Sequence, residues 1–198
     1  MAGYGLRPYM GKAFGQAYNT GGFTEYPIDV SVVTYDCYTG DFMTLTSTGE
    51  VTRTNGTAGA TPVAATFTIG VAVGFRYVDP DGDIKWSQKY VGNANNTEAY
   101  AFIVSDPDAA FIVQADGAVT QASVGARAPV VNFIGSAASS LTGNSGMQLD
   151  ASEIATTATF ALQIIGIPQD GSNETSTTPN IVVRLTPGVH QANIALGV

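Results

Sequence analysis

The sequence predicts an all-β fold, an antiparallel β-sandwich or barrel of the jelly-roll type. Runs of β-branched and aromatic residues recur along the chain, and the longest covers residues 66–78. Dipeptides that tolerate positive φ follow several of these runs, as hairpin turns require. Long amphipathic segments, which parallel βαβ units need between their strands, do not occur. The turn dipeptides are Asn55-Gly56, Asp81-Gly82, Asp116-Gly117 and Asp170-Gly171.

The expected strands can be assigned in order along the chain. The first covers residues 26–34, where Ile28, Val30 and Val32 alternate onto one face. Within the longest run, Gly70 and Gly74 predict a bulge or a close approach of two backbones. Helix is limited to single turns at 123–128 and 152–154. The remaining expected strands cover residues 42–46, 50–54, 66–78, 83–90, 99–105, 110–115, 118–121, 129–134, 147–149, 156–167 and 180–186.

Two segments have the composition of long loops. Residues 135–146 are rich in Ser and Gly and carry no charge, and residues 169–179 are polar between two apolar strands. Loops of this length are usually functional or mobile, and a free solvated loop is the simpler alternative.

Composition narrows the function classes. The 198 residues carry only 12% charged side chains, yet their net charge is −8, with 44% hydrophobic residues. This composition excludes a disordered chain and a coiled coil. The negative net charge also disfavours nonspecific binding to nucleic acid. The single cysteine, Cys37, cannot form an internal disulfide and suits a reducing compartment. We expect no signal peptide and no membrane span, since every apolar run is short.

Residues 1–24 differ from the rest and are predicted to form an extended N-terminal arm on a single domain of residues 25–198. The arm carries two basic residues and no acid, so its charge is +2, while the other 6 bases and 16 acids give the body −10. Its apolar rings follow no strand or helix period, and rings of this size are natural anchors for pockets on a partner. A frayed or self-packed terminus is the alternative. The predicted partner-binding residues are Tyr4, Leu6, Arg7, Tyr9, Lys12, Phe14, Tyr18 and Phe23.

Catalytic signals are weak throughout. His190 is the only histidine and has no identifiable nucleophile beside it. The alternating carboxylates Asp79, Asp81 and Asp83 resemble the start of a calcium loop, but Tyr90 stands where a bidentate Glu is needed, so a hairpin tip is expected. Trp86 is expected to be a packed or half-exposed strand residue, with a sugar-stacking platform as the alternative. We therefore expect a binding surface, with no catalytic residues, metal or cofactor.

Six segments, taken in order, resemble a family of small structural proteins of tailed bacteriophages, especially marine and cyanobacterial phages. The order of these segments carries the resemblance, because each is weak alone. Ser105 departs from the pattern, which has an acid there. The segments are Tyr4-Gly5-Leu6-Arg7-Pro8, then Tyr26-Pro27-Ile28 with Tyr38-Thr39-Gly40-Asp41-Phe42, then Gly70 to Tyr77, then Phe111 to Gly117 after Asp106-Pro107, then Thr142 to Asp150, and finally Val183-Arg184.

The resemblance implies a capsid decoration or cement protein on the outside of the virion head. Such proteins are commonly β-rich and often trimeric, so the implied partners are the major capsid protein and further copies of the chain. It implies assembly in the host cytoplasm. From the charge, the short apolar runs and the missing motifs, we expect no nucleic-acid or membrane partner and no cofactor. A carbohydrate-binding β-sandwich module, or another head or tail accessory protein, is the alternative.

Overall fold

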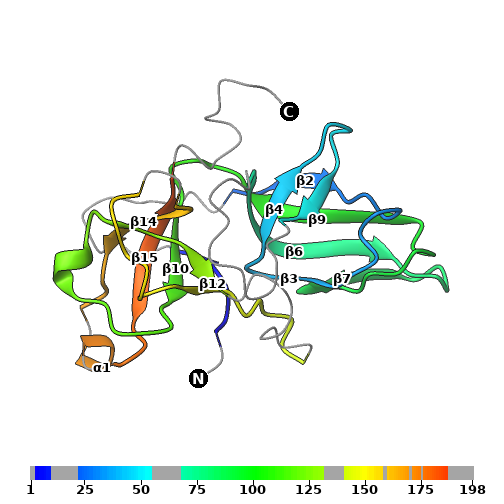
Figure 1. Ribbon diagram of the computed structural model, residues 1–198. Helices are drawn as coiled ribbons and strands as arrows, with labels where there is room; N and C mark the ends of the chain where they lie inside the picture. Colours follow the sequence, from blue (N-terminus) through cyan, green and yellow to red (C-terminus); the bar gives the residue numbers. More distant parts are fainter. Residues whose placement is uncertain are drawn as a thin grey trace.

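Two antiparallel sheets make up most of the computed structural model (Figure 1). The structure describes residues 3–9, 22–54, 68–131, 141–157, 160–169, 171–174 and 176–186. The predicted all-β class is confirmed, since helix in these residues is limited to the 3₁₀ turn Gln121–Ser123 and the single turn α1 (Gly171–Glu174).

The first sheet has six strands and curls toward closure. Its order is β2-β9-β6-β4-β5, and β7 also pairs with β6. An isolated bridge between Ile28, which follows β2, and Val51 in β5 brings the two edges together. A two-stranded ladder of β3 (Cys37–Tyr38) and β8 (Lys89–Tyr90) lies beside it. The six strands are β2 (Thr24–Pro27), β4 (Phe42–Leu45), β5 (Val51–Arg53), β6 (Gly70–Val78), β7 (Ile84–Ser87) and β9 (Glu98–Val104).

The second sheet has five strands in the order β1-β10-β15-β14-β11, and it also closes on itself. The pair β12–β13 follows β11 after one residue. An isolated bridge joins Leu149 of β13 to Ala115, the residue after β10, and this bridge connects the pair to the end of β10. The five strands are β1 (Arg7–Pro8), β10 (Ala110–Gln114), β11 (Arg127–Ala128), β14 (Leu162–Gly166) and β15 (Asn180–Leu185), and the separate pair is β12 (Val130–Val131) with β13 (Gln148–Leu149).

Each sheet surrounds its own hydrophobic cluster. Phe75, Tyr77 and Tyr90 belong to the first cluster, and Phe111 and Leu162 to the second. The clusters adjoin where three residues of the first sheet join the second cluster, and these residues are Phe42, Val71 and Val104. The sequence predicted one domain, and the structure divides its core between these two adjoining parts.

The prediction that Gly70 and Gly74 mark a bulge or a close approach of two backbones is confirmed, since both features occur in β6. The register of β6 with β9 shifts between Ala72 and Gly74, which marks a bulge. At Gly70, a Cβ atom would stand 2.2 Å from the carbonyl oxygen of Val104, so the two backbones approach too closely for any side chain.

Several expected boundaries were wrong, for local reasons. The strand expected at 26–34 ends at Pro27, because Asp29 Oδ1 accepts hydrogen bonds from the N–H groups of Ser31 and Val32 and turns the chain. The expected strand 83–90 divides at Gln88 into β7 and β8. Residues 118–121 form no strand, and 127–128 belong to β11 rather than to a helical turn. Asn55-Gly56 and the Asp170 end of the last turn dipeptide lie outside the described residues.

Residues 3–9 form a strap between the two sheets. β1 pairs with β10, and the Leu6 N–H donates to Gly40 O. The Leu6 side chain is fully buried in the second cluster. Leu6 is therefore an anchor for the chain's own core, which corrects the expectation that it anchors a partner. The self-packed alternative describes this part of the predicted arm.

Candidate interaction surface

The tip carrying Asp79, Asp81 and Asp83 is a tight hairpin between β6 and β7. Asp79 Oδ1 accepts the N–H groups of Asp81 and Asp83, and Lys85 pairs with the Asp79 and Asp83 carboxylates at 3.2 and 3.0 Å. A backbone hydrogen bond from Asp83 is the largest cause of the lowered pKa of Asp79. Among the described residues, no group of three or more ligating side chains could hold a metal ion. The hairpin-tip interpretation therefore accounts for the motif.

We predict that Asp79→Ala lowers the melting temperature by a few degrees, because two backbone donors lose their acceptor. Asp79→Asn is the matched control, because it keeps an acceptor oxygen at the same position and should retain most of the stability. Millimolar calcium should leave the melting temperature of the wild type unchanged in differential scanning fluorimetry. A rise with calcium would contradict the hairpin-tip interpretation.

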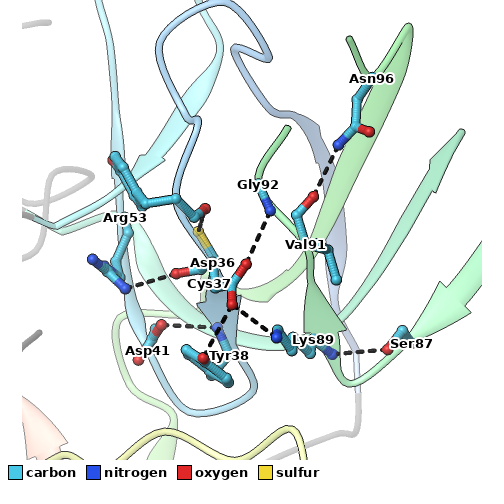
Figure 2. Close-up of polar contacts among 11 residues, drawn as sticks. Asp36, Cys37, Tyr38, Asp41, Arg53, Ser87, Lys89, Val91, Gly92 and Asn96 are labelled. Carbon is cyan, nitrogen blue, oxygen red and sulfur yellow. Dashed lines mark hydrogen bonds and ion pairs between the residues drawn. The ribbon is translucent and has the colours of Figure 1, made fainter. Parts of the chain in front are cut away.

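A cluster of polar side chains connects strand β8 with the segment that precedes strand β3. Figure 2 shows its contacts. Lys89 Nζ lies 2.8 Å from Asp36 Oδ2, and the Tyr38 hydroxyl donates to the same oxygen at 3.3 Å. The Gly92 N–H donates to Asp36 Oδ1. The hydrogen bond with Asp36 is the main cause of the raised pKa of Lys89. A lysine held charged in this way is a structural cross-link and a poor base or nucleophile.

A second part of this cluster lies deeper, around Asp41. Arg53, only 6% exposed, donates to Asp36 O at 2.7 Å and covers the Tyr35 ring at 4.6 Å. Burial raises the pKa of Asp41 to about 6, although hydrogen bonds from Ser145 and the Tyr38 N–H and the charge of Arg53 oppose the rise. Burial likewise raises the pKa of the Cys37 thiol. Cys37 is thus a core residue without the exposed thiolate that nucleophilic chemistry requires.

The outer face of the six-stranded sheet carries exposed rings instead. We define the aromatic face as Phe23, Ile84, Trp86, Tyr100 and Phe102. Trp86 is 70% exposed, Ile84 63% and Phe23 58%. The Trp86 and Phe102 rings are stacked with centroids 5.6 Å apart, and Phe23 meets Phe102 edge-on at 5.1 Å.

Strand register explains how these rings meet. Trp86 in β7 and Tyr100 in β9 lie opposite Arg76 on either side of β6, while Phe102 lies opposite Gly74. Because Gly74 has no side chain, the indole can reach across β6 to the Phe102 ring. Arg76 lies 4.4 Å from the Tyr100 centroid and 5.9 Å from that of Trp86. Arg76 also pairs with Glu25 and Glu98 at 3.3 Å each.

The predicted partner-binding residues therefore separate into three groups. Tyr4, Leu6, Arg7 and Tyr9 belong to the strap, where the Tyr4 hydroxyl donates to Asn180 and Arg7 covers the Tyr4 ring at 4.6 Å. Lys12, Phe14 and Tyr18 lie outside the described residues, as does His190. Of the predicted residues that the structure describes, only Phe23 lies on the aromatic face.

Sequence reasoning considered Trp86 singly and missed the residues that surround it. Tyr100 and Phe102 alternate along the expected strand 99–105, and that alternation was the available signal. Their proximity to Trp86 depends on pairing of strands that the sequence did not specify.

Comparison with protein-family models, with curated proteins and with solved structures finds no match for this chain. Within the described residues, no helix is long and apolar enough to cross a membrane.

Proposed function

We propose that this chain is a structural virion protein that binds the outer surface of a tailed-phage capsid and stabilises the shell. The proposal rests on the sequence resemblance, and one structural observation favours it. The segments that carry the resemblance lie far apart in the sequence but are direct neighbours in the fold.

Backbone contacts join these segments one to another. The Leu6 N–H donates to Gly40 O, the Gly40 N–H to Ala72 O, and the Ser145 N–H to Thr39 O. The Asp116 N–H donates to Leu149 O, and Phe111 pairs with Val183. These contacts join the segments into one structural unit, as a resemblance that covers the whole fold requires.

Local geometry explains why the pattern contains these glycines. Gly5 and Gly40 have φ of +72° and +94° and lie back to back, so a Cβ on Gly40 would stand 2.9 Å from the Leu6 nitrogen. A Cβ on Gly5 would stand 2.6 Å from Cβ of Ser145. Only glycine combines this conformation with this close approach.

The scarcity of charge fits a role in an assembly, because charged residues are depleted in the cores of protein interfaces. A homotrimer would repeat each contact with the shell three times, so weak individual contacts would give tight attachment by avidity. The partners in this proposal are the major capsid protein and two further copies of the chain.

The test is co-sedimentation of the purified chain with expanded phage heads that lack it, followed by cryo-electron microscopy of the decorated particles. We expect saturable binding and density on the outer surface at positions of local threefold symmetry. A chain that stays in the supernatant, or that maps to the tail, would contradict the proposal.

The role of the predicted arm needs a separate variant. Deleting residues 1–22 would remove Leu6 from the core, so a loss of binding could reflect unfolding. The variant Phe14→Ser with Tyr18→Ser leaves the strap intact and removes two predicted anchors. Reduced occupancy with an unchanged melting temperature is expected, and full occupancy would exclude the arm contact without affecting the proposal of shell binding.

A further inference from the structure

We propose that the aromatic face is a binding site for a neutral glycan, with one pyranose ring stacked on the exposed side of Trp86. This goes beyond attachment to a shell and does not depend on it.

The indole of Trp86 is stacked on the Phe102 ring before any ligand arrives. Its plane makes an angle of 13° with the Phe102 ring, which supports it from one side, and Phe23 meets Phe102 edge-on in turn. The opposite side of the indole faces solvent, as its 70% exposure requires. A rigid, solvent-facing ring offers apolar contact at low entropic cost, because no side chain has to be ordered on binding.

Polar groups border this ring in the way that a sugar requires. A pyranose has an apolar face of C–H groups and a rim of hydroxyls, which need donors and acceptors in the plane around the platform. Arg76 provides the donors, and Glu25 and Glu98, whose side chains are 44% and 47% exposed, provide the acceptors. The two ion pairs hold the guanidinium, which lies 5.9 Å from the Trp86 centroid, so donors and acceptors are close to the platform.

The charges on the face select among glycans. Two carboxylates surround one guanidinium, and the exposed Asp83 and half-buried Lys85 at the adjoining hairpin add no net positive charge. A uronate or sulfated sugar would meet net repulsion here, whereas neutral hexoses and N-acetylhexosamines would not.

The size of the patch favours a small ligand over a second protein. Only three side chains of the face are more than half exposed, and fully buried aromatic side chains contribute about 150–250 Å² each. The apolar area on offer is therefore a few hundred Å², well below the roughly 800 Å² per partner of a stable protein interface. A single sugar ring and its neighbours match that area.

The experiment uses the full-length chain on an array of immobilised neutral, amino and acidic glycans, and then titrations with the best ligand. Trp86 is the only tryptophan of the chain, so its fluorescence reports directly on stacking. We expect binding to neutral glycans, with a saturable change in emission. By calorimetry, Trp86→Ala should weaken binding at least about tenfold. Val32→Ala, which removes a side chain 57% exposed in the turn after β2, is the matched control and should bind as the wild type does.

Unchanged melting temperatures would show that both variants are folded. The proposal is overturned if the wild type binds no glycan on the array, if acidic glycans bind more tightly than neutral ones, or if Trp86→Ala binds normally. It is also overturned if sedimentation shows that the chain self-associates and Trp86→Ala abolishes that association, because the face would then be a subunit interface.

Discussion

Leu6→Ala should lower the free energy of unfolding by about 2–5 kcal/mol, the range measured for large-to-small substitutions in protein cores. Leu6 is fully buried and contributes to the cluster formed by Phe111, Val113 and Leu162. Its removal would leave a cavity where the strap meets both sheets, and the hydrogen bond from the Leu6 N–H to Gly40 would no longer be held by packing. Urea unfolding followed by circular dichroism measures the difference.

The neighbouring Arg7→Ala is the matched control. Arg7 is exposed, and its described contact is with the Tyr4 ring, so the loss should be well below 1 kcal/mol. If the two variants lost equal stability, or if Leu6→Ala lost none, the strap would not be part of the core. The result decides how truncations of the first 24 residues are to be interpreted, because a chain that lacks Leu6 should be unstable for reasons unrelated to any partner.

Asp41→Asn should remove a pH dependence of stability that the wild type shows between about pH 4 and pH 6. The folded pKa of Asp41 is raised from 3.8 to about 6 by burial. The unfolded chain therefore releases this proton at a lower pH than the folded chain does. The stabilising contribution is complete below pH 4 and is lost as the pH rises through 6, by about 3 kcal/mol in total, at about 1.4 kcal/mol per pH unit.

The asparagine variant keeps the shape of Asp41 and stays neutral. Its oxygen can still accept the Tyr38 N–H, and its amide can donate to the Ser145 hydroxyl. We therefore expect the variant and the wild type to be equally stable near pH 4, with the variant the more stable by up to about 3 kcal/mol at pH 7. Denaturant unfolding at several pH values provides the comparison, and Asp108→Asn, at an exposed carboxylate, is the control. A difference between variant and wild type that is constant with pH would show that Asp41 does not titrate in this range.

The location of Asp41 gives this prediction a structural meaning. The residue lies at the junction where residues 39–41 contact both the strap and residues 143–145. A buried carboxylate at such a junction costs stability when it is ionised, and the surrounding hydrogen bonds only partly offset that cost. The stability of the strap should therefore be greater in mild acid than at neutral pH.

Local sequence features were sufficient for the fold class and for most of the strands. The run that became β6, the β-branched residues of β10 and β15, and the Asp81-Gly82 turn each depend on a few adjacent residues. Local chemistry also predicted the constraint at Gly70, because a glycine inside a strand pattern commonly marks a bulge or a close approach of two backbones. The error at 26–34 is of the same local kind, since Asp29 competes with the strand for backbone donors.

The tertiary structure alone decided which of these residues act together. In the sequence, nothing distinguishes Leu6 from other apolar residues of an irregular terminus. Its burial depends on the pairing of β1 with β10, about a hundred residues away. Asp41 became a buried carboxylate because the fold brings Ser145 and Arg53, which are distant in sequence, next to it. Trp86 became part of a platform because Gly74 and Phe102 are opposite one another in register. The physical reason is the same in each case. Strand propensity is a property of neighbouring residues, whereas burial, pKa and ring stacking depend on which distant strands pair, and in what register.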